Sequence, residues 1–192
     1  MTLTEFQEIL KDTTVSTEQF LRVHCCIEEL FRRLLLIGLR LKGVQFKESA
    51  AISVIYYSNK RIETMEMILK YCGIDYKEMR KFRNFEILQT LYLQFTSRHR
   101  NRLMHGEALT YSDKELLELL ISVDKSFIGE IQAYLTSISK PSIFDTPAKW
   151  GAKKGIKADI KKVYRDLFGK DMKPQPEYDR KKALSIMKKL KK

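Results

Sequence analysis

The sequence EQFLRVHCCIEELFRRLLLIGLRLK, residues 18–42, sets the first expectation for the fold. Its apolar side chains recur at steps of three and four residues, at Phe20, Val23, Ile27, Leu30, Phe31, Leu34, Ile37 and Leu41. This spacing matches the 3.6-residue turn of an α-helix with one apolar face. We expect an N-cap at Ser16 or Thr17 and a left-handed end at Gly43. A helix of this length, apolar along one side, predicts a core made by packing other helices against it.

The same period continues along most of the chain. The chain holds only 8 Gly and 4 Pro, which favours long helices over many short strands and turns. We expect further helices over residues 4–11, 47–71, 76–104 (with a break near Asn84), 113–135, 157–168 and 180–189. The sequence therefore predicts an all-α protein, an up-and-down helical bundle over residues 1–140 followed by a basic, partly helical C-terminal extension over residues 141–192.

Local signals refine some of these boundaries. Gly73 and Gly106 follow two of the expected helices, where a left-handed residue commonly ends a helix. Ser112, with Glu115 three residues later, has the spacing of a capping box at a helix start. A strand over Ile52–Tyr57 is the alternative within residues 47–71, because β-branched residues are frequent there.

The positive charge is concentrated toward the end of the sequence. The chain has 36 Lys and Arg against 24 Asp and Glu, a formal net charge of +12. Residues 141–192 hold 16 of these basic and 6 of these acidic side chains, which leaves 20 and 18 for residues 1–140. A basic extension attracts polyanions by releasing their counterions, and nucleic acid is the polyanion we expect. An acidic membrane surface and a purely solubilising role are the alternatives.

Several classes of protein are disfavoured. The sequence has no run of about 20 apolar residues that could span a membrane. Its first residues, MTLTEFQEIL, lack the basic start and apolar middle of a signal peptide. Cys25, Cys26 and Cys72 cannot all pair, and no CxxC or HxxxH spacing suggests a metal. We expect a cytoplasmic protein with reduced thiols, without a metal or cofactor.

The stretch SRHRNRLMHGE, residues 97–107, carries the chemistry that stands out. It holds three arginines and two of the three histidines at the end of an apolar helix. On an unbroken helix Arg100 and His105 lie about 140° apart, so they converge only if the helix ends between them or a partner chain completes the site. Arg98, Arg102 and His105 instead share one face. A solvated basic helix end, favoured by the helix dipole, is the alternative.

Residues 100–105, Arg-Asn-Arg-Leu-Met-His, resemble the Arg-(polar)-three residues-His motif of HEPN domains (higher eukaryotes and prokaryotes nucleotide-binding), and Gly106 also fits. The expected helical layout is compatible with that family over about residues 17–138. The resemblance implies a helical bundle with the motif near the end of a late helix. It also implies a metal-independent endoribonuclease, used as a toxin or in antiviral defence, that dimerises. Some HEPN domains keep the fold without cleavage.

Carried over by position, the resemblance assigns roles to three residues. Arg100 would hold the scissile phosphate and stabilise its developing charge. His105 would act as general base or acid when the RNA 2′-hydroxyl attacks, and Asn101 would orient His105 or the phosphate. The product would end in a 2′,3′-cyclic phosphate, and DNA would survive. We expect RNA as substrate, a homodimer, and an antitoxin or other regulatory protein as partner.

Other basic residues are expected to bind RNA without taking part in the chemistry. These are Arg98, Arg102, Lys153, Lys154, Lys157 and Lys161. Trp150 would either stack on a base or anchor the extension to the bundle. The non-catalytic readings are a nucleic-acid-binding module and a helical protein-interaction module.

Four more side chains have a structural reading that we prefer to a catalytic one. His99 falls on the face of Phe95 and is expected at the edge of the core. His24, beside Cys25, is expected to pack in the core rather than activate a thiol. Glu28 and Glu29 are expected to pair with Arg32 or Arg33, and contact with residues 100–105 is the alternative.

Overall fold

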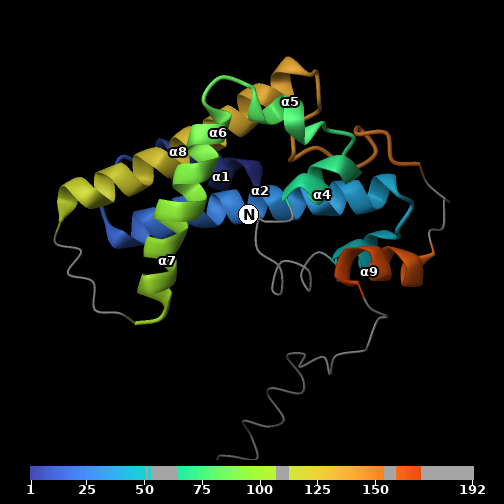
Figure 1. Ribbon diagram of the computed structural model, residues 1–192, viewed down its shortest axis with the longest axis horizontal. Coiled ribbons are helices and arrows are strands. Elements are labelled where there is room, and N and C mark those ends of the chain that lie inside the picture. Colours follow the sequence, from blue (N-terminus) through green and yellow to red (C-terminus); the bar gives the residue numbers. More distant parts are fainter. Residues whose placement is uncertain (51, 53–64, 107–112, 154–158, 170–192) are drawn as a thin grey trace, which may run out of the picture. The chain divides into compact units, whose positions relative to one another are not determined.

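The computed structural model describes residues 1–50, 52, 65–106, 113–153 and 159–169 (Figure 1). The chain forms two compact units, Met1–Ala158 and Asp159–Lys192, and each is considered by itself. Within the described ranges every regular element is helical and no strand occurs. The prediction of an all-α protein is therefore confirmed. None of the helices in those ranges is both long and apolar enough to cross a membrane.

The first two helices begin and end close to the predicted positions. Helix α1 spans Leu3–Lys11, and a capping box between Thr2 and Glu5 closes its start. Helix α2 spans Thr17–Leu41, and the Ser16 hydroxyl accepts a hydrogen bond from the backbone N–H of Gln19 at 3.0 Å. Ser16 is thus the N-cap, because its side chain satisfies an amide that has no partner within the helix. Gly43 follows with φ of 86°, as its position suggested.

Helix α4, Met65–Tyr71, packs closely on α2. A Cβ added to Gly38 of α2 would lie 2.6 Å from the Cβ of Tyr71, so only glycine allows this approach. Residues 46–50 are also helical, at the start of the predicted 47–71 helix. Most of the Ile52–Tyr57 segment lies outside the described residues, so neither a helix nor a strand is assigned there.

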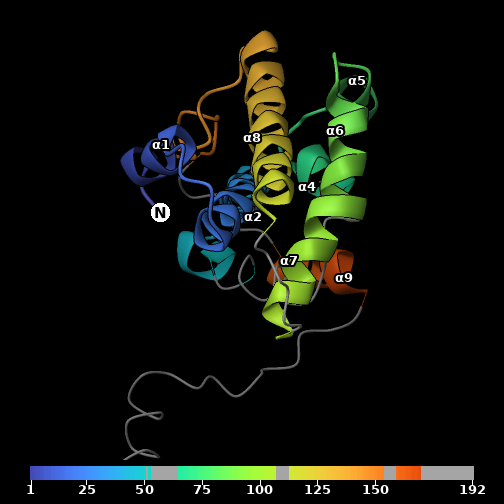
Figure 2. The ribbon, with the colours of Figure 1, turned by 90° about the vertical axis from the view of Figure 1, so that its left-hand side faces the viewer.

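A continuous rod carries the sequence that interests us (Figure 2). It consists of α6, Phe85–Leu91, the π-helical turn η2, Tyr92–Thr96, and α7, Ser97–Met104. The short helix α5, Tyr76–Arg80, precedes it, and the predicted break near Asn84 occurs where Arg83 has φ of 43°. The π turn was not predicted, because the apolar spacing was read as an unbroken α-helix.

Helix α8, Lys114–Ser137, packs against α2, α6 and η2. Its N-cap is Asp113, whose carboxylate accepts a hydrogen bond from the N–H of Leu116 at 3.1 Å. The prediction of a cap at Ser112 was wrong by one residue, since Asp caps a helix as well as Ser does. The side chains between these helices form the core, among them the fully buried Phe20, Ile27, Leu34, Phe85, Tyr92, Leu120, Phe127 and Ile131.

The segment after Pro141 belongs to the first compact unit. The ring of Phe144 lies 5.0 Å from that of Phe6 in α1, and the guanidinium of Arg33 in α2 lies 4.5 Å above the Phe144 ring. Trp150 is half-buried and donates its indole N–H to the Ser142 carbonyl at 3.1 Å. Phe144 therefore joins this segment to α1 and α2, whereas the indole hydrogen bond of Trp150 stays within the segment.

The second unit is described over residues 159–169. Helix α9, Ile160–Phe168, begins at Asp159, whose carboxylate accepts N–H groups of the first turn, and ends at Gly169 with φ of 66°. It lies within the predicted 157–168 helix and carries Lys161, Lys162 and Arg165 among apolar residues. The predicted helix over residues 180–189 lies outside the described residues.

Candidate functional site

The π turn sets the direction in which α7 presents its side chains. Its defining hydrogen bond runs from the N–H of Ser97 to the carbonyl of Tyr92, five residues back. Tyr92 is fully buried, and its ring stacks 5.0 Å from that of His24 in α2. In an unbroken α-helix Tyr92 and Arg100 would lie about 80° apart, and the extra residue of the π turn reduces this to about 20°. Both residues therefore face α2.

Arg100 makes contact with α2 through its guanidinium. Its Nη2 donates to the Glu28 carboxylate at 3.0 Å, and its Nη1 donates to the Asn101 side-chain oxygen Oδ1 at 3.2 Å. The Arg100 and Glu28 side chains are 28% and 33% exposed, so solvent reaches both. We call this contact the Arg100–Glu28 pair.

The sequence predicted that Glu28 and Glu29 would each pair with Arg32 or Arg33, and this was right only for Glu29. Glu29 accepts hydrogen bonds from both Arg32 and Arg33, at 2.7–2.8 Å. Glu28 instead reaches Arg100 of α7, so the expected local partner was wrong for this residue. The difference arises because neighbouring residues on a helix point about 100° apart, and only Glu28 is directed at α7.

His105 lies just beyond the end of α7. It is the C-cap, with φ of −91° and ψ of 10°, and its N–H still donates to the Asn101 carbonyl at 3.0 Å. The helix thus continues through Met104 and does not end between Arg100 and His105. The two residues remain about 140° apart around the axis and about 7.5 Å apart along it. The His105 side chain is exposed, and a single chain does not direct Arg100 and His105 at one point.

The remaining predicted RNA-binding residues divide by location. Arg98 and Arg102 are exposed on α7, Lys153 is exposed near the end of the first unit, and Lys161 is exposed on α9. Lys154 and Lys157 lie outside the described residues. Gly106 follows the motif with φ of 71°, a conformation that terminates α7 as predicted.

His99 takes the position at the core edge that the sequence suggested. Its ring meets the Phe95 ring edge-on at 5.0 Å, and it is partly buried. Burial lowers the pKa of His99, and the nearby positive charge of Arg102 lowers it further. Both effects favour the neutral imidazole of His99, which takes a structural position distinct from that of His105.

Neither the two cysteines of α2, Cys25 and Cys26, nor Cys72 just after α4 has an activated thiol. Burial is the largest cause of the raised pKa of the Cys25 thiol, Glu28 raises it further, and Arg100 acts in the opposite direction. Burial raises the pKa of Cys26 and of Cys72 to about 12. A raised pKa leaves little thiolate at neutral pH, so none of these thiols is an activated nucleophile, although Cys25 is exposed.

Sequence reasoning missed a buried polar pair between α2 and α8. The His24 ring nitrogen Nδ1 lies 2.7 Å from Oδ2 of Asp124, and the side chains are 2% and 0% exposed. The available signal was Asp124 itself, a carboxylate on the same apolar face as Leu120 and Phe127. His24 of this pair stacks on Tyr92, the first residue of η2, so the pair packs directly against the π turn.

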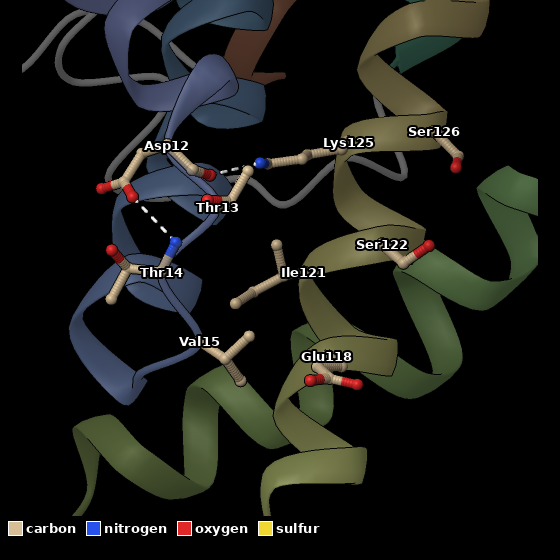
Figure 3. A pocket seen from close by; sticks show the side chains of 9 residues that line it. All are labelled: Asp12, Thr13, Thr14, Val15, Glu118, Ile121, Ser122, Lys125 and Ser126. Atoms are coloured by element: carbon tan, nitrogen blue, oxygen red, sulfur yellow. Dashed lines mark hydrogen bonds between the residues drawn. The ribbon is translucent and has the colours of Figure 1, made fainter.

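A shallow hollow of about 260 Å³ lies between the α1–α2 connection and α8 (Figure 3). Thr13, Val15 and Ser122 are among its lining residues, and none of residues 97–106 contributes. Lys125 at its edge donates to the Asp12 carbonyl at 2.6 Å, just past the end of α1. The hollow is accordingly explained by helix capping and packing.

Comparisons with known proteins give no further guidance: no family model, curated protein or solved structure matches this chain. Over the described part of the chain, no group of three or more His, Cys, Asp or Glu side chains is placed to hold a metal ion.

Proposed function

We propose that this chain is a metal-independent endoribonuclease of HEPN type that acts as a homodimer. The observation that carries the proposal is the exposed end of α7, where Arg100, Asn101 and His105 lie within two turns. A planar guanidinium suits a phosphate, and histidine suits proton transfer near neutral pH. π turns are frequent next to functional sites, and one immediately precedes this segment.

The reaction proposed needs only these groups and the RNA. The 2′-oxygen forms a bond to the adjacent phosphorus while the bond from phosphorus to the 5′-oxygen breaks. A general base accepts the 2′-hydroxyl proton, and a general acid protonates the departing 5′-oxygen. Arg100 stabilises the additional negative charge on the phosphoryl oxygens, and Asn101 holds the guanidinium in place. The products are a 2′,3′-cyclic phosphate end and a 5′-hydroxyl end.

A dimer supplies what one chain lacks. Arg100 and His105 leave α7 in different directions, so His105 of one chain would act with Arg100 of the other across a shared cleft. Two copies would also provide two histidines, one as base and one as acid. The basic residues of α9 and the exposed Lys153 would attract RNA to this dimer.

The biological setting proposed is a toxin or an antiviral defence nuclease. Such an enzyme needs restraint in its own cell, which an antitoxin or other regulatory protein would provide. A cytoplasmic location follows from the proposed RNA substrate.

One observation favours the alternative, a non-catalytic nucleic-acid-binding module. Arg100 already pairs with Glu28, and this carboxylate offsets the positive charge that a transition state would use. Such a module would bind RNA in a salt-sensitive manner and leave it intact.

The deciding experiment is incubation of a mixed RNA with purified protein in excess EDTA. We expect the parent to leave cyclic phosphate ends and to spare DNA. Arg100→Ala and His105→Ala should each lose roughly 10²–10⁴-fold in cleavage rate, with unchanged circular dichroism. His99→Gln, at the core edge of α7, and Arg80→Ala, on α5, are the controls and should cleave as the parent does. Binding without cleavage by the parent would support the non-catalytic module instead.

A further inference from the structure

We propose that the Glu28 carboxylate occupies the position on Arg100 that an RNA phosphate takes, so that RNA binding displaces Glu28. This inference rests on the proposed function, since it concerns regulation of the same site. Glu28 lies on α2, 72 residues before Arg100, and no residue pattern along the chain connects them.

The geometry of the contact makes it exchangeable. Glu28 meets Arg100 through a single hydrogen bond of 3.0 Å, on side chains that solvent reaches. By contrast, Glu29 on the same helix accepts three shorter bonds from two arginines and is only 13% exposed. Single contacts between partly exposed side chains contribute little to stability, and a better anion replaces them at small cost. Glu28 thus orients the Arg100 side chain, but another anion can replace it.

A phosphate is the better anion for this guanidinium. Arginine binds carboxylates and phosphates through the same N–H groups, and phosphate can accept two of them in parallel. The Asn101 side-chain oxygen accepts from Nη1 of the Arg100 guanidinium, and Nη2 is left for Glu28.

Glu28 also distinguishes ligands by their charge. Its carboxylate cancels the Arg100 charge in the absence of ligand, so neutral or weakly anionic molecules gain little by replacing it. A polyanion that contacts several basic residues at once gains enough to replace Glu28 on Arg100. Glu28 therefore acts as a positioning residue that keeps Arg100 oriented and lowers its affinity for isolated anions.

The test is the binding of a short single-stranded RNA whose 2′-O-methyl groups prevent cleavage, followed by fluorescence anisotropy. Glu28→Gln keeps the shape of the side chain and removes the competing charge. We expect it to bind this RNA about twofold to fivefold more tightly than the parent, the range that loss of an exposed ion pair allows. Glu29→Gln is the matched control, because it removes the same charge one residue away and the hydrogen bonds of Glu29 go to Arg32 and Arg33 of its own helix. It should not tighten binding.

A second pair of variants shows whether the effect passes through Arg100. In an Arg100→Ala background, Glu28→Gln should no longer change RNA affinity. Two measurements check that Glu28→Gln keeps the fold. The Cys25 thiol should be alkylated faster, because Glu28 raises its pKa, and the thermal unfolding midpoint should stay the same. If the parent cleaves RNA, Glu28→Gln should lower KM, because the substrate phosphate no longer has to displace a carboxylate.

Three results would overturn the inference. Glu28→Gln could bind RNA no better than the parent, Glu29→Gln could tighten binding equally, or neither the parent nor Glu28→Gln could bind this RNA. The nuclease proposal is judged separately by cleavage. A parent that binds but does not cleave removes that proposal and leaves the displacement of Glu28 intact, whereas a cleaving parent with no gain in Glu28→Gln does the reverse.

Discussion

Removal of Asp124 and His24 together should destabilise the protein by less than the sum of the two single removals. The pair is almost fully buried, with 2.7 Å between His24 Nδ1 and Asp124 Oδ2. Loss of one partner from such a pair leaves an unsatisfied polar group in the core and costs about 3–5 kcal/mol. Since a domain is stable by about 5–15 kcal/mol, Asp124→Ala should remove a large part of the free energy of unfolding.

The second carboxylate oxygen explains why the double variant should cost less than the two single variants added together. Asp124 Oδ1 is buried, and no described residue donates a hydrogen bond to it. The desolvation cost of the carboxylate is therefore only partly offset, and the intact pair stabilises the fold by less than its disruption costs. In a His24→Ala background, Asp124→Ala should cost at least about 2 kcal/mol less than it does in the parent.

The assay is urea unfolding followed by circular dichroism for the parent, His24→Ala, Asp124→Ala and the double variant. Equal m-values would show that the unfolding transitions are comparable. For a chain of this size, Asp124→Ala should lower Tm by roughly 10 °C. Asp124→Asn, which keeps the shape, should lie between the parent and Asp124→Ala. Single-variant costs that add to within about 0.5 kcal/mol would refute the reasoning, because residues that interact cannot be independent.

Three further predictions concern other parts of the first unit. Gly38→Ala should destabilise the fold by about 1–3 kcal/mol in urea unfolding, because its Cβ would lie 2.6 Å from that of Tyr71; an unchanged midpoint would contradict this close approach. Burial opposes ionisation of Glu29, but hydrogen bonds from Arg32 and its neighbour outweigh burial and lower the carboxyl pKa from 4.5. The stabilisation that ionised Glu29 gives to the fold is present above its unfolded-state pKa and is lost as the pH falls through its folded-state pKa. Glu29→Gln should therefore cost about 1 kcal/mol in the free energy of unfolding at neutral pH and progressively less on acidification. A cost that does not change with pH would argue against this reasoning. Iodoacetamide at pH 7, read by peptide mass spectrometry, should modify native Cys25 more slowly than a free thiol and spare the two buried cysteines until the protein is unfolded, whereas rapid labelling of Cys25 would contradict its raised pKa.

The sequence predicted most of what local rules control. Apolar spacing located the described helices, and caps or glycines placed several of their ends, as at Ser16 and Gly43. These features depend on residues a few positions apart, which a sequence displays directly. The cap at Asp113 shows the limit of such rules, because two adjacent residues could each serve.

The candidate site was predicted in composition but not in arrangement. Arg100 and His105 were identified from their types and spacing, yet the partner of Arg100 lies on a distant helix. For Glu28, the sequence offered two nearby arginines, and only the packing of α2 against α7 decides between them. The His24–Asp124 pair was missed for the same reason, since the contact joins residues 100 positions apart.

The π turn has a consequence for how chain length relates to this site. Because η2 holds one residue more than an α-helical turn of the same height, deletion of a single residue within 92–96 would regularise the rod and leave Arg100 directed at Glu28. Forcing those five residues into α geometry without a deletion would instead rotate α7 by about 100°. The amino-acid sequence from Arg100 to His105 would be identical in the chain with the deletion and in the full-length chain forced into α geometry. A search that reads only this motif would therefore rate the two alike, although only the shortened chain retains the geometry.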